Sequence, residues 1–185
     1  MRCLIVLVAA LAVACAPASA APAAGPDRGF ERLELLETAV LRELNRSRST
    51  RGLRALHATA GLRSAAVSHS RAMLELGFFG HESADGTAFD DRLRRSYSDR
   101  GWETWSVAET LVAGSREMDA RRAVAAWIGS PSHRAIILSA QWRDAGIGAM
   151  FTPVAPGDFG GTATLVVTAD FGVRAGRAKP SGGRR

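Results

Sequence analysis

The chain has almost no cysteine. Its two cysteines, Cys3 and Cys15, both lie near the N-terminus. If an N-terminal leader is removed on export, the remaining chain has no disulfide bond to stabilise its fold and no thiol nucleophile. The chain also lacks the His-Glu-x-x-His helix of zinc peptidases and the Gly-x-Ser-x-Gly turn of many serine hydrolases. These absences make an enzyme less favoured than a non-catalytic protein.

Only one long apolar run is present, and it lies at the N-terminus. Arg2 precedes the apolar residues 4–14, and Ala18-Ser19-Ala20 offers a small-residue cleavage site. This arrangement predicts a signal peptide over residues 1–20, followed by a linker over 21–29 that is rich in Ala, Pro and Gly. Residues 11–15 also resemble a bacterial lipobox, so an alternative is a lipoprotein anchored through Cys15. We expect a secreted, extracellular protein with no transmembrane segment.

The body of the chain lacks an excess of charge, although the formal net charge is +6. One basic residue lies in the leader, and five lie in residues 174–185, which contain no acid. Subtracting these six from 24 basic residues leaves 18, which equals the 18 acidic residues. We therefore expect no nucleic-acid partner, and we interpret residues 174–185 as a basic disordered tail. Weak attraction to an anionic envelope is the alternative use of that tail.

Hydrophobic spacing predicts helices first and strands mostly later. Apolar residues at three- and four-residue steps predict helices that begin near residue 30, 59, 89 and 117. Thr59 is a candidate N-cap, Gly77 a helix stop, and Ser130-Pro131 the start of a fifth helix. Strands are predicted within 102–111 and over 145–151 and 162–171, with a hairpin loop at 157–161. This order predicts one α+β domain over residues 30–173 with a mostly antiparallel sheet.

Three residues in well-defined local contexts are candidates for a site: His81, Glu109 and His133. Imidazole and carboxylate groups bind divalent metals and transfer protons near neutral pH. Glu109 stands in an apolar run, where a carboxylate either has a partner or points to solvent. His133 should lie in the first turn of its helix, where the helix dipole favours neutral imidazole. Each of the three also has an ordinary structural interpretation.

Several segments, in order, resemble motifs of one known family. They are residues 41–48, 77–86, 108–111, 127–138, 145–148 and 170–172. On these motifs the chain resembles the bacterial branch of the CAP superfamily (cysteine-rich secretory proteins, antigen 5 and pathogenesis-related 1), also called SCP domains. The match spans roughly residues 33–172 and implies a three-layer α-β-α sandwich.

The resemblance also implies that His81, Glu109 and His133 line one central cleft and act as metal ligands. Many family members carry a second Glu shortly after the tryptophan that corresponds to Trp127. Residues 128–130 contain no acid, and Ala108 and Thr110 replace the usual Gly and Asn. The resemblance therefore implies three ligands that hold Zn²⁺ or another divalent cation weakly, with water completing the set.

Three functions remain open from the sequence. The first is a secreted, non-catalytic binding module whose cleft holds a metal and a small lipid or sterol-like ligand, as some family members do. The second is a metal-dependent hydrolase, since two His and one Glu resemble a zinc peptidase ligand set. The third is an envelope or host-interaction protein with a vestigial site.

Overall fold

Three long antiparallel strands form the centre of the molecule. The computed structural model describes residues 29–177. Strand β5 (Thr162–Arg177) lies between β4 (Asp144–Ala155) and β3 (Trp102–Gly114), and β3 forms one edge of the sheet. Two short strands pair with the outer side of β4: β1 (Glu31–Arg32) runs antiparallel to it and β2 (His57–Ala58) runs parallel. The predicted α+β class with a mostly antiparallel sheet is confirmed.

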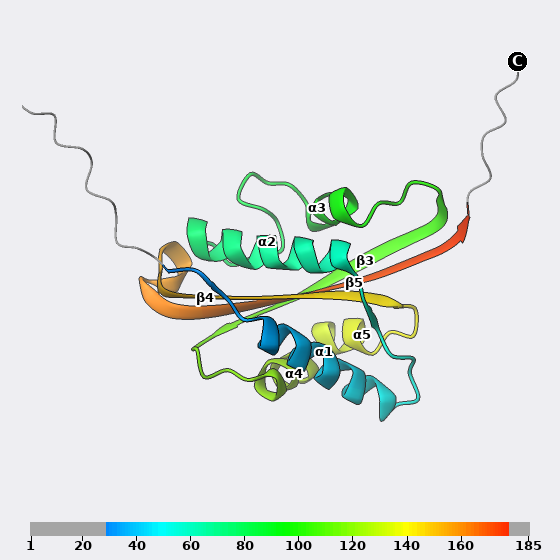
Figure 1. The fold of residues 1–185 in the computed structure, drawn as a ribbon, viewed down its shortest axis with the longest axis horizontal. Helices are drawn as coiled ribbons and strands as arrows, with labels where there is room; N and C mark the ends of the chain where they lie inside the picture. The colour runs from blue at the N-terminus through cyan, green and yellow to red at the C-terminus, as the bar shows by residue number, and fades with distance from the viewer. Residues whose placement is uncertain (1–28, 178–185) are drawn as a thin grey trace, which may run out of the picture.

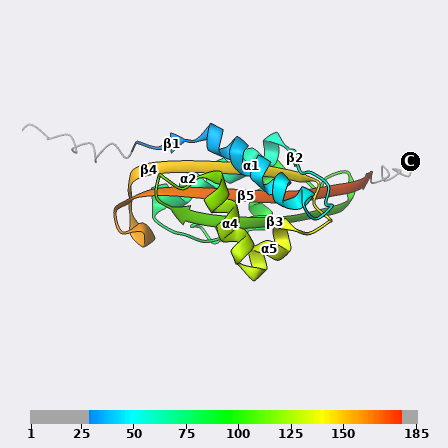
Figure 2. The ribbon, with the colours of Figure 1, turned by 90° about the horizontal axis from the view of Figure 1, so that it is seen from below.

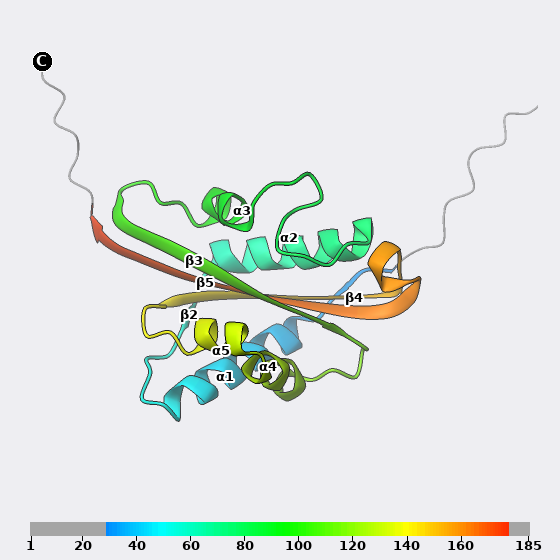
Figure 3. The same cartoon turned by 180° about the vertical axis from the view of Figure 1, so that it is seen from behind.

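Helices cover both faces of this sheet (Figure 1). Helices α2 (Ala60–Leu76) and α3 (Phe89–Ser96) lie on one face. Helices α1 (Glu34–Ser49), α4 (Ala120–Gly129) and α5 (Pro131–Ile137) lie on the other, as the reverse view also shows (Figure 3). The structure is thus the three-layer α-β-α sandwich that was expected. We call the two sides of the sheet the α2 face and the α1 face.

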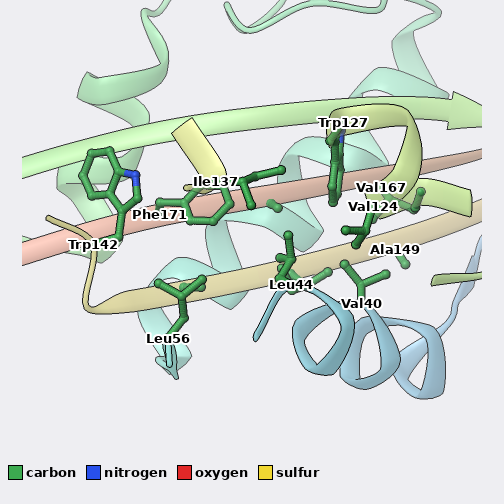
Figure 4. Packing of buried hydrophobic residues seen from close by; sticks show 14 of the residues in the cluster. Val40, Leu44, Leu56, Val124, Trp127, Ile137, Trp142, Ala149, Val167 and Phe171 are labelled. Carbon is green, nitrogen blue, oxygen red and sulfur yellow. The ribbon is translucent and has the colours of Figure 1, made fainter. Parts of the chain in front are cut away.

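The α1 face carries the main apolar core (Figure 4). Val40 and Leu44 of α1 pack with Val124 and Trp127 of α4 against the sheet. Trp127 is 1% exposed, and its indole Nε1–H donates to the carbonyl oxygen of Leu111 at 2.9 Å. Strand β5 supplies every second residue to this core: Leu165, Val167, Ala169 and Phe171.

The α2 face is packed more closely because β4 has glycines there. A Cβ atom on Gly146 would come within 2.1 Å of the backbone of α2, and one on Gly148 within 2.3 Å. Any side chain at these positions would force helix and sheet apart. On this face Ser70 of α2 donates to the carbonyl of Gly148 at 3.1 Å and lies 2.8 Å from the Thr168 hydroxyl.

Most predicted elements are present, but two predicted caps are not made. Gly77 ends α2 in the left-handed conformation, with φ of 73°. Thr59 and Ser130 occupy the N-cap positions of α2 and α5, yet neither side chain accepts a capping hydrogen bond. The side chain that does cap is Asp119, which accepts from the backbone N–H of Arg122 at 2.8 Å and starts α4 three residues later than expected.

The boundaries of the domain also differ from the prediction. Strand β5 continues through Arg177, so residues 174–177 belong to the sheet and not to a disordered tail. Hydrogen bonding to β3 explains this extension, because Arg177 pairs with Trp102 and Arg174 with Trp105. The predicted signal peptide, most of the linker, Cys15 and residues 178–185 lie outside the described residues. Within residues 29–177, no helix is both long and apolar enough to cross a membrane.

Candidate functional site

Glu109 is buried and paired at the middle of β3. Its neighbours Val107 and Leu111 pack on the α2 face, so alternation along the strand directs Glu109 to the same side. The carboxylate is fully buried; Oε1 accepts from His81 Nδ1 at 2.8 Å, and Oε2 accepts from Arg92 Nη2. Burial alone would raise the pKa of Glu109, but His81 and Arg92 hold it below its usual range. The paired interpretation of Glu109 is therefore correct, and the solvent-facing one is wrong.

His81 lies on the loop between α2 and α3, and several contacts hold that loop. The Arg92 guanidinium donates through Nη1 to the carbonyl oxygen of His81 at 2.8 Å. The preceding carbonyl, that of Gly80, accepts from His69 Nε2 at 2.9 Å. Phe79 donates its backbone N–H to Asp158 in the β4–β5 connection at 3.1 Å. The His81 side chain is 48% exposed, so one edge of the ring is fixed by Glu109 while the rest meets solvent.

His69 is a member of this cluster that the sequence did not reveal. Its side chain is fully buried on α2, and Nε2 lies 3.9 Å from Glu109 Oε1. Because a carbonyl oxygen can only accept a hydrogen bond, His69 Nε2 is protonated and donates to the Gly80 carbonyl. In the neutral ring, Nδ1 is therefore a buried acceptor, and it has no partner among the described residues. Burial lowers the pKa of His69, so the ring is neutral at pH 7.

Asp170 brings a second carboxyl group to the cluster. It lies directly opposite Glu109 in the β3–β5 register, so the two side chains share the α2 face. Asp170 is completely buried, and its carboxyl group lies within hydrogen-bond reach of the Glu109 carboxylate, to which it donates when protonated. Burial, together with the charge of Glu109, raises the pKa of Asp170 well above its usual range. Of the two carboxyl groups, Glu109 is ionised and Asp170 is protonated.

His133 lies in the other helical layer. It stands in the first turn of α5, as predicted, but α5 packs against the α1 face through residues such as Ile137, next to Ala108 and Val112. No hydrogen bond or ion pair joins His133 to Glu109 in the described part of the chain. Burial and the nearby charge of His81 lower the pKa of His133, which agrees with the expected neutral imidazole. The structure thus joins His81 to Glu109 by a hydrogen bond, and it places His133 close enough to His81 for the charge of His81 to lower the pKa of His133.

Sequence comparison identifies the family. A family model described as "CAP: Cysteine-rich secretory protein family" matches residues 41–166, more than half of the chain. The chain belongs to the CAP family. No curated protein sequence matches it.

Solved structures support the same fold. The chain is similar to an outer surface protein from Borrelia burgdorferi, with a TM-score of 0.62 and 20% identity over 78% of this chain and 98% of that one. It is also similar to an extracellular SCP-domain protein from Bacillus anthracis (TM-score 0.57, 22% identity, 75% of this chain) and a cysteine-rich secretory protein from Staphylococcus aureus (TM-score 0.52, 15% identity, 75% of this chain). The CAP domain here spans only 40% and 38% of the length of the latter two proteins.

The cluster does not fit a metal ion as it is arranged. Within the described residues, no three His, Cys, Asp or Glu side chains are grouped so that they could hold one. Both oxygens of Glu109 already accept hydrogen bonds, one of them from a cation. The metal site at His81, Glu109 and His133 stays a prediction. What the geometry does provide is an oriented, half-exposed imidazole.

Proposed function

We propose that this CAP protein is an extracellular, non-catalytic binding module that takes a small lipid-like ligand in the hollow between α1 and α4, which we call the α1–α4 groove. The two helices lie side by side over the sheet (Figure 2). The groove has a volume of about 640 Å³ and is lined by Leu35, Leu36 and Ala39 of α1 and by Ala120 of α4. That volume is typical of sites for small organic ligands.

The exposure of the Leu35 side chain is the observation that carries this proposal. Its side chain is 87% exposed, although leucine on a globular protein is normally buried. Leu35 and Leu36 also line an adjoining hollow of about 490 Å³ that includes Leu33 and Met118. The two hollows share these leucines, so apolar side chains continue from one hollow into the other.

Basic side chains surround the other end of the α1–α4 groove. Arg42, Arg46 and Arg121 line it, together with the acids Glu43 and Asp119. Arg46 lies 3.8 Å from Glu43, whereas Arg42 and Arg121 form no ion pair within residues 29–177. The lining carries three guanidinium groups against two carboxylates, and this excess of positive charge beside an apolar surface favours an amphipathic ligand with an anionic head group.

The extracellular location rests on the sequence and on the relatives. Two of the structural relatives are described as an extracellular protein and an outer surface protein, and the family description is that of secretory proteins. The predicted signal peptide over residues 1–20 supports the same location.

Catalysis is not part of the proposal. Nucleophilic catalysis needs a hydroxyl or thiol within hydrogen-bond reach of a base. No hydroxyl group in the described chain is hydrogen-bonded to His81 or His133, and Ser132, next to His133, lies instead 3.1 Å from the Ser130 hydroxyl. No specific observation therefore favours the hydrolase.

The proposal is tested by displacement of a fluorescent fatty acid from the purified protein. We expect saturable binding by the wild type and roughly 10-fold weaker binding by Leu35→Asp, because the introduced carboxylate would place a charge on the apolar surface. Leu76→Asp is the matched control, since Leu76 is 64% exposed on α2 in the other layer. Absence of binding by the wild type, or equal loss in both variants, would contradict a ligand site in the groove.

A further inference from the structure

We propose that Arg92 takes the place of a metal ion at this CAP site, so that its guanidinium is the permanent cation of the His81–Glu109 cluster. The inference does not depend on the proposed ligand of the α1–α4 groove, which lies in the opposite layer. It rests on where Arg92 lies, what it contacts, and which charges the cluster has.

Arg92 bridges the Glu109 carboxylate and the main chain of His81. Its Nη2 donates to Glu109 Oε2, and its Nη1 donates to the carbonyl oxygen of His81 at 2.8 Å. The Arg92 side chain is 12% exposed and that of Glu109 is fully buried, so this ion pair is largely removed from water. One planar group thereby fixes both the carboxylate and the main chain that carries the imidazole.

The packing of α3 against α2 directs the Arg92 side chain toward the cluster. Leu93 is fully buried against Leu62 and Ala65 of α2, and Phe89 is partly buried in the same apolar group. Arg92 follows Phe89 by three residues, so the two side chains lie on neighbouring positions of the helix surface. The ring of Phe89 lies 6.3 Å from that of His81. The apolar anchors of α3 thus place the guanidinium under the loop that carries His81.

A guanidinium in this position excludes a divalent ion from Glu109. Arginine stays protonated at every ordinary pH, so its charge cannot be removed to make room for a metal. A divalent cation bound at Oε1 would lie a few ångströms from that charge, with little water between them to screen the repulsion. The segment after Trp127 also contains no second acid to offset it. Compared with a four-ligand site, this cluster has one anion fewer and one cation more.

Two substitutions that differ in charge test the idea by zinc titration calorimetry on the folded protein. We expect no binding heat from wild type or from Arg92→Lys, because both keep a cation beside Glu109. Arg92→Gln removes the opposing charge, so Glu109 and His81, with water completing the ligand set, should bind about one Zn²⁺ per chain at least roughly 10-fold more tightly than wild type. Thermal unfolding should show a higher Tm with zinc for Arg92→Gln only, and the double variant Arg92→Gln/His81→Ala should lose both effects.

Three results would overturn the proposal. The first is stoichiometric zinc binding by wild type that His81→Ala abolishes. The second is equal zinc affinity in Arg92→Lys and Arg92→Gln. The third is a folded Arg92→Gln variant that binds no zinc. If Arg92→Gln does not fold in metal-free buffer, circular dichroism with added zinc decides, since recovery of native signal supports the proposal and its absence counts against it.

Discussion

The same three strands bury different chemistry on their two faces. On the α1 face, β5 contributes Val167, Ala169 and Phe171 to a continuous apolar core. On the α2 face, the intervening residues include Thr168 and Asp170, which lie among buried polar groups of α2 and β3. One strand therefore forms an ordinary core on one side and a polar cluster on the other. The β5 side chains on the α1 face fill volume in the apolar core, whereas those on the α2 face include polar groups that need partners.

Close backbone packing explains why the polar face tolerates these groups. Gly146 and Gly148 let α2 lie directly on β4, so that Ser70 reaches both the Gly148 carbonyl and the Thr168 hydroxyl. Short, fixed distances of this kind supply hydrogen-bond partners that a looser interface would not. This comparison predicts that truncating a side chain lowers the free energy of unfolding most on the α1 face. Changes of charge or hydrogen bonding should affect that free energy mainly on the α2 face.

The largest expected effect is truncation of the tryptophan in the apolar core. Trp127→Ala should lower the free energy of unfolding by about 3–5 kcal/mol, because it leaves a large cavity and removes the hydrogen bond to the Leu111 carbonyl. Trp105→Ala is the matched control on the α2 face, where Trp105 is only partly buried, and should cost about 1–2 kcal/mol. Urea unfolding measures both. Equal losses would mean that the two faces do not differ in packing.

The next effect concerns the buried carboxyl group on the α2 face. The pKa of Asp170 is raised in the folded state, so the folded protein keeps a proton that the unfolded chain loses above a pH of about 4. That contribution is present below the unfolded pKa and is lost as the pH rises toward the folded pKa. Asp170→Asn removes the titration, so its stability should rise relative to wild type as the pH increases from about 4 toward the folded pKa of Asp170. Urea unfolding across this range measures the difference.

Asp85→Asn is a control of opposite sign. The backbone and side chain of Thr87 hold the pKa of the exposed Asp85 below its usual range. Asp85 therefore stabilises the fold above its unfolded pKa, and its replacement should lose stability relative to wild type as the pH rises. If Asp170→Asn and Asp85→Asn change in the same direction with pH, the protonated state assigned to Asp170 is wrong.

Local signals predicted the helices and the three long strands, but not the short strands β1 and β2. Periodic apolar residues located four helices, Ser130-Pro131 located the fifth, and Gly77 ended α2 in the left-handed conformation. These features depend on neighbours a few residues apart, which a sequence displays directly. The continuation of β5 to Arg177 was missed because it depends on pairing with Trp102, 75 residues away in the chain.

The site was predicted only in part for the same reason. His81 and Glu109 were both predicted as site residues, but Asp170 joins them through strand register and Arg92 through the rotation of α3. His69 did leave a signal, since it lies on the apolar stripe of α2 at helical spacing from Ala65 and Met73. A histidine on such a stripe is polar, buried and in need of a partner. The placement of α5 on the α1 face left no sequence signal that we can identify.

The smallest and sharpest test uses the same substitution on both faces. Thr168 on the α2 face lies 2.8 Å from the Ser70 hydroxyl, whereas Thr110 on the α1 face has a buried hydroxyl with no partner among the described residues. Thr168→Val should lower the free energy of unfolding by about 1 kcal/mol, because it breaks a buried hydrogen bond. Thr110→Val should lie within about 0.5 kcal/mol of wild type or be more stable, because it removes an unsatisfied polar atom at constant volume. Urea unfolding of both variants gives the sign and size of each change. A loss of stability at Thr110 as large as that at Thr168 would show that buried hydroxyl groups contribute equally to stability on both faces.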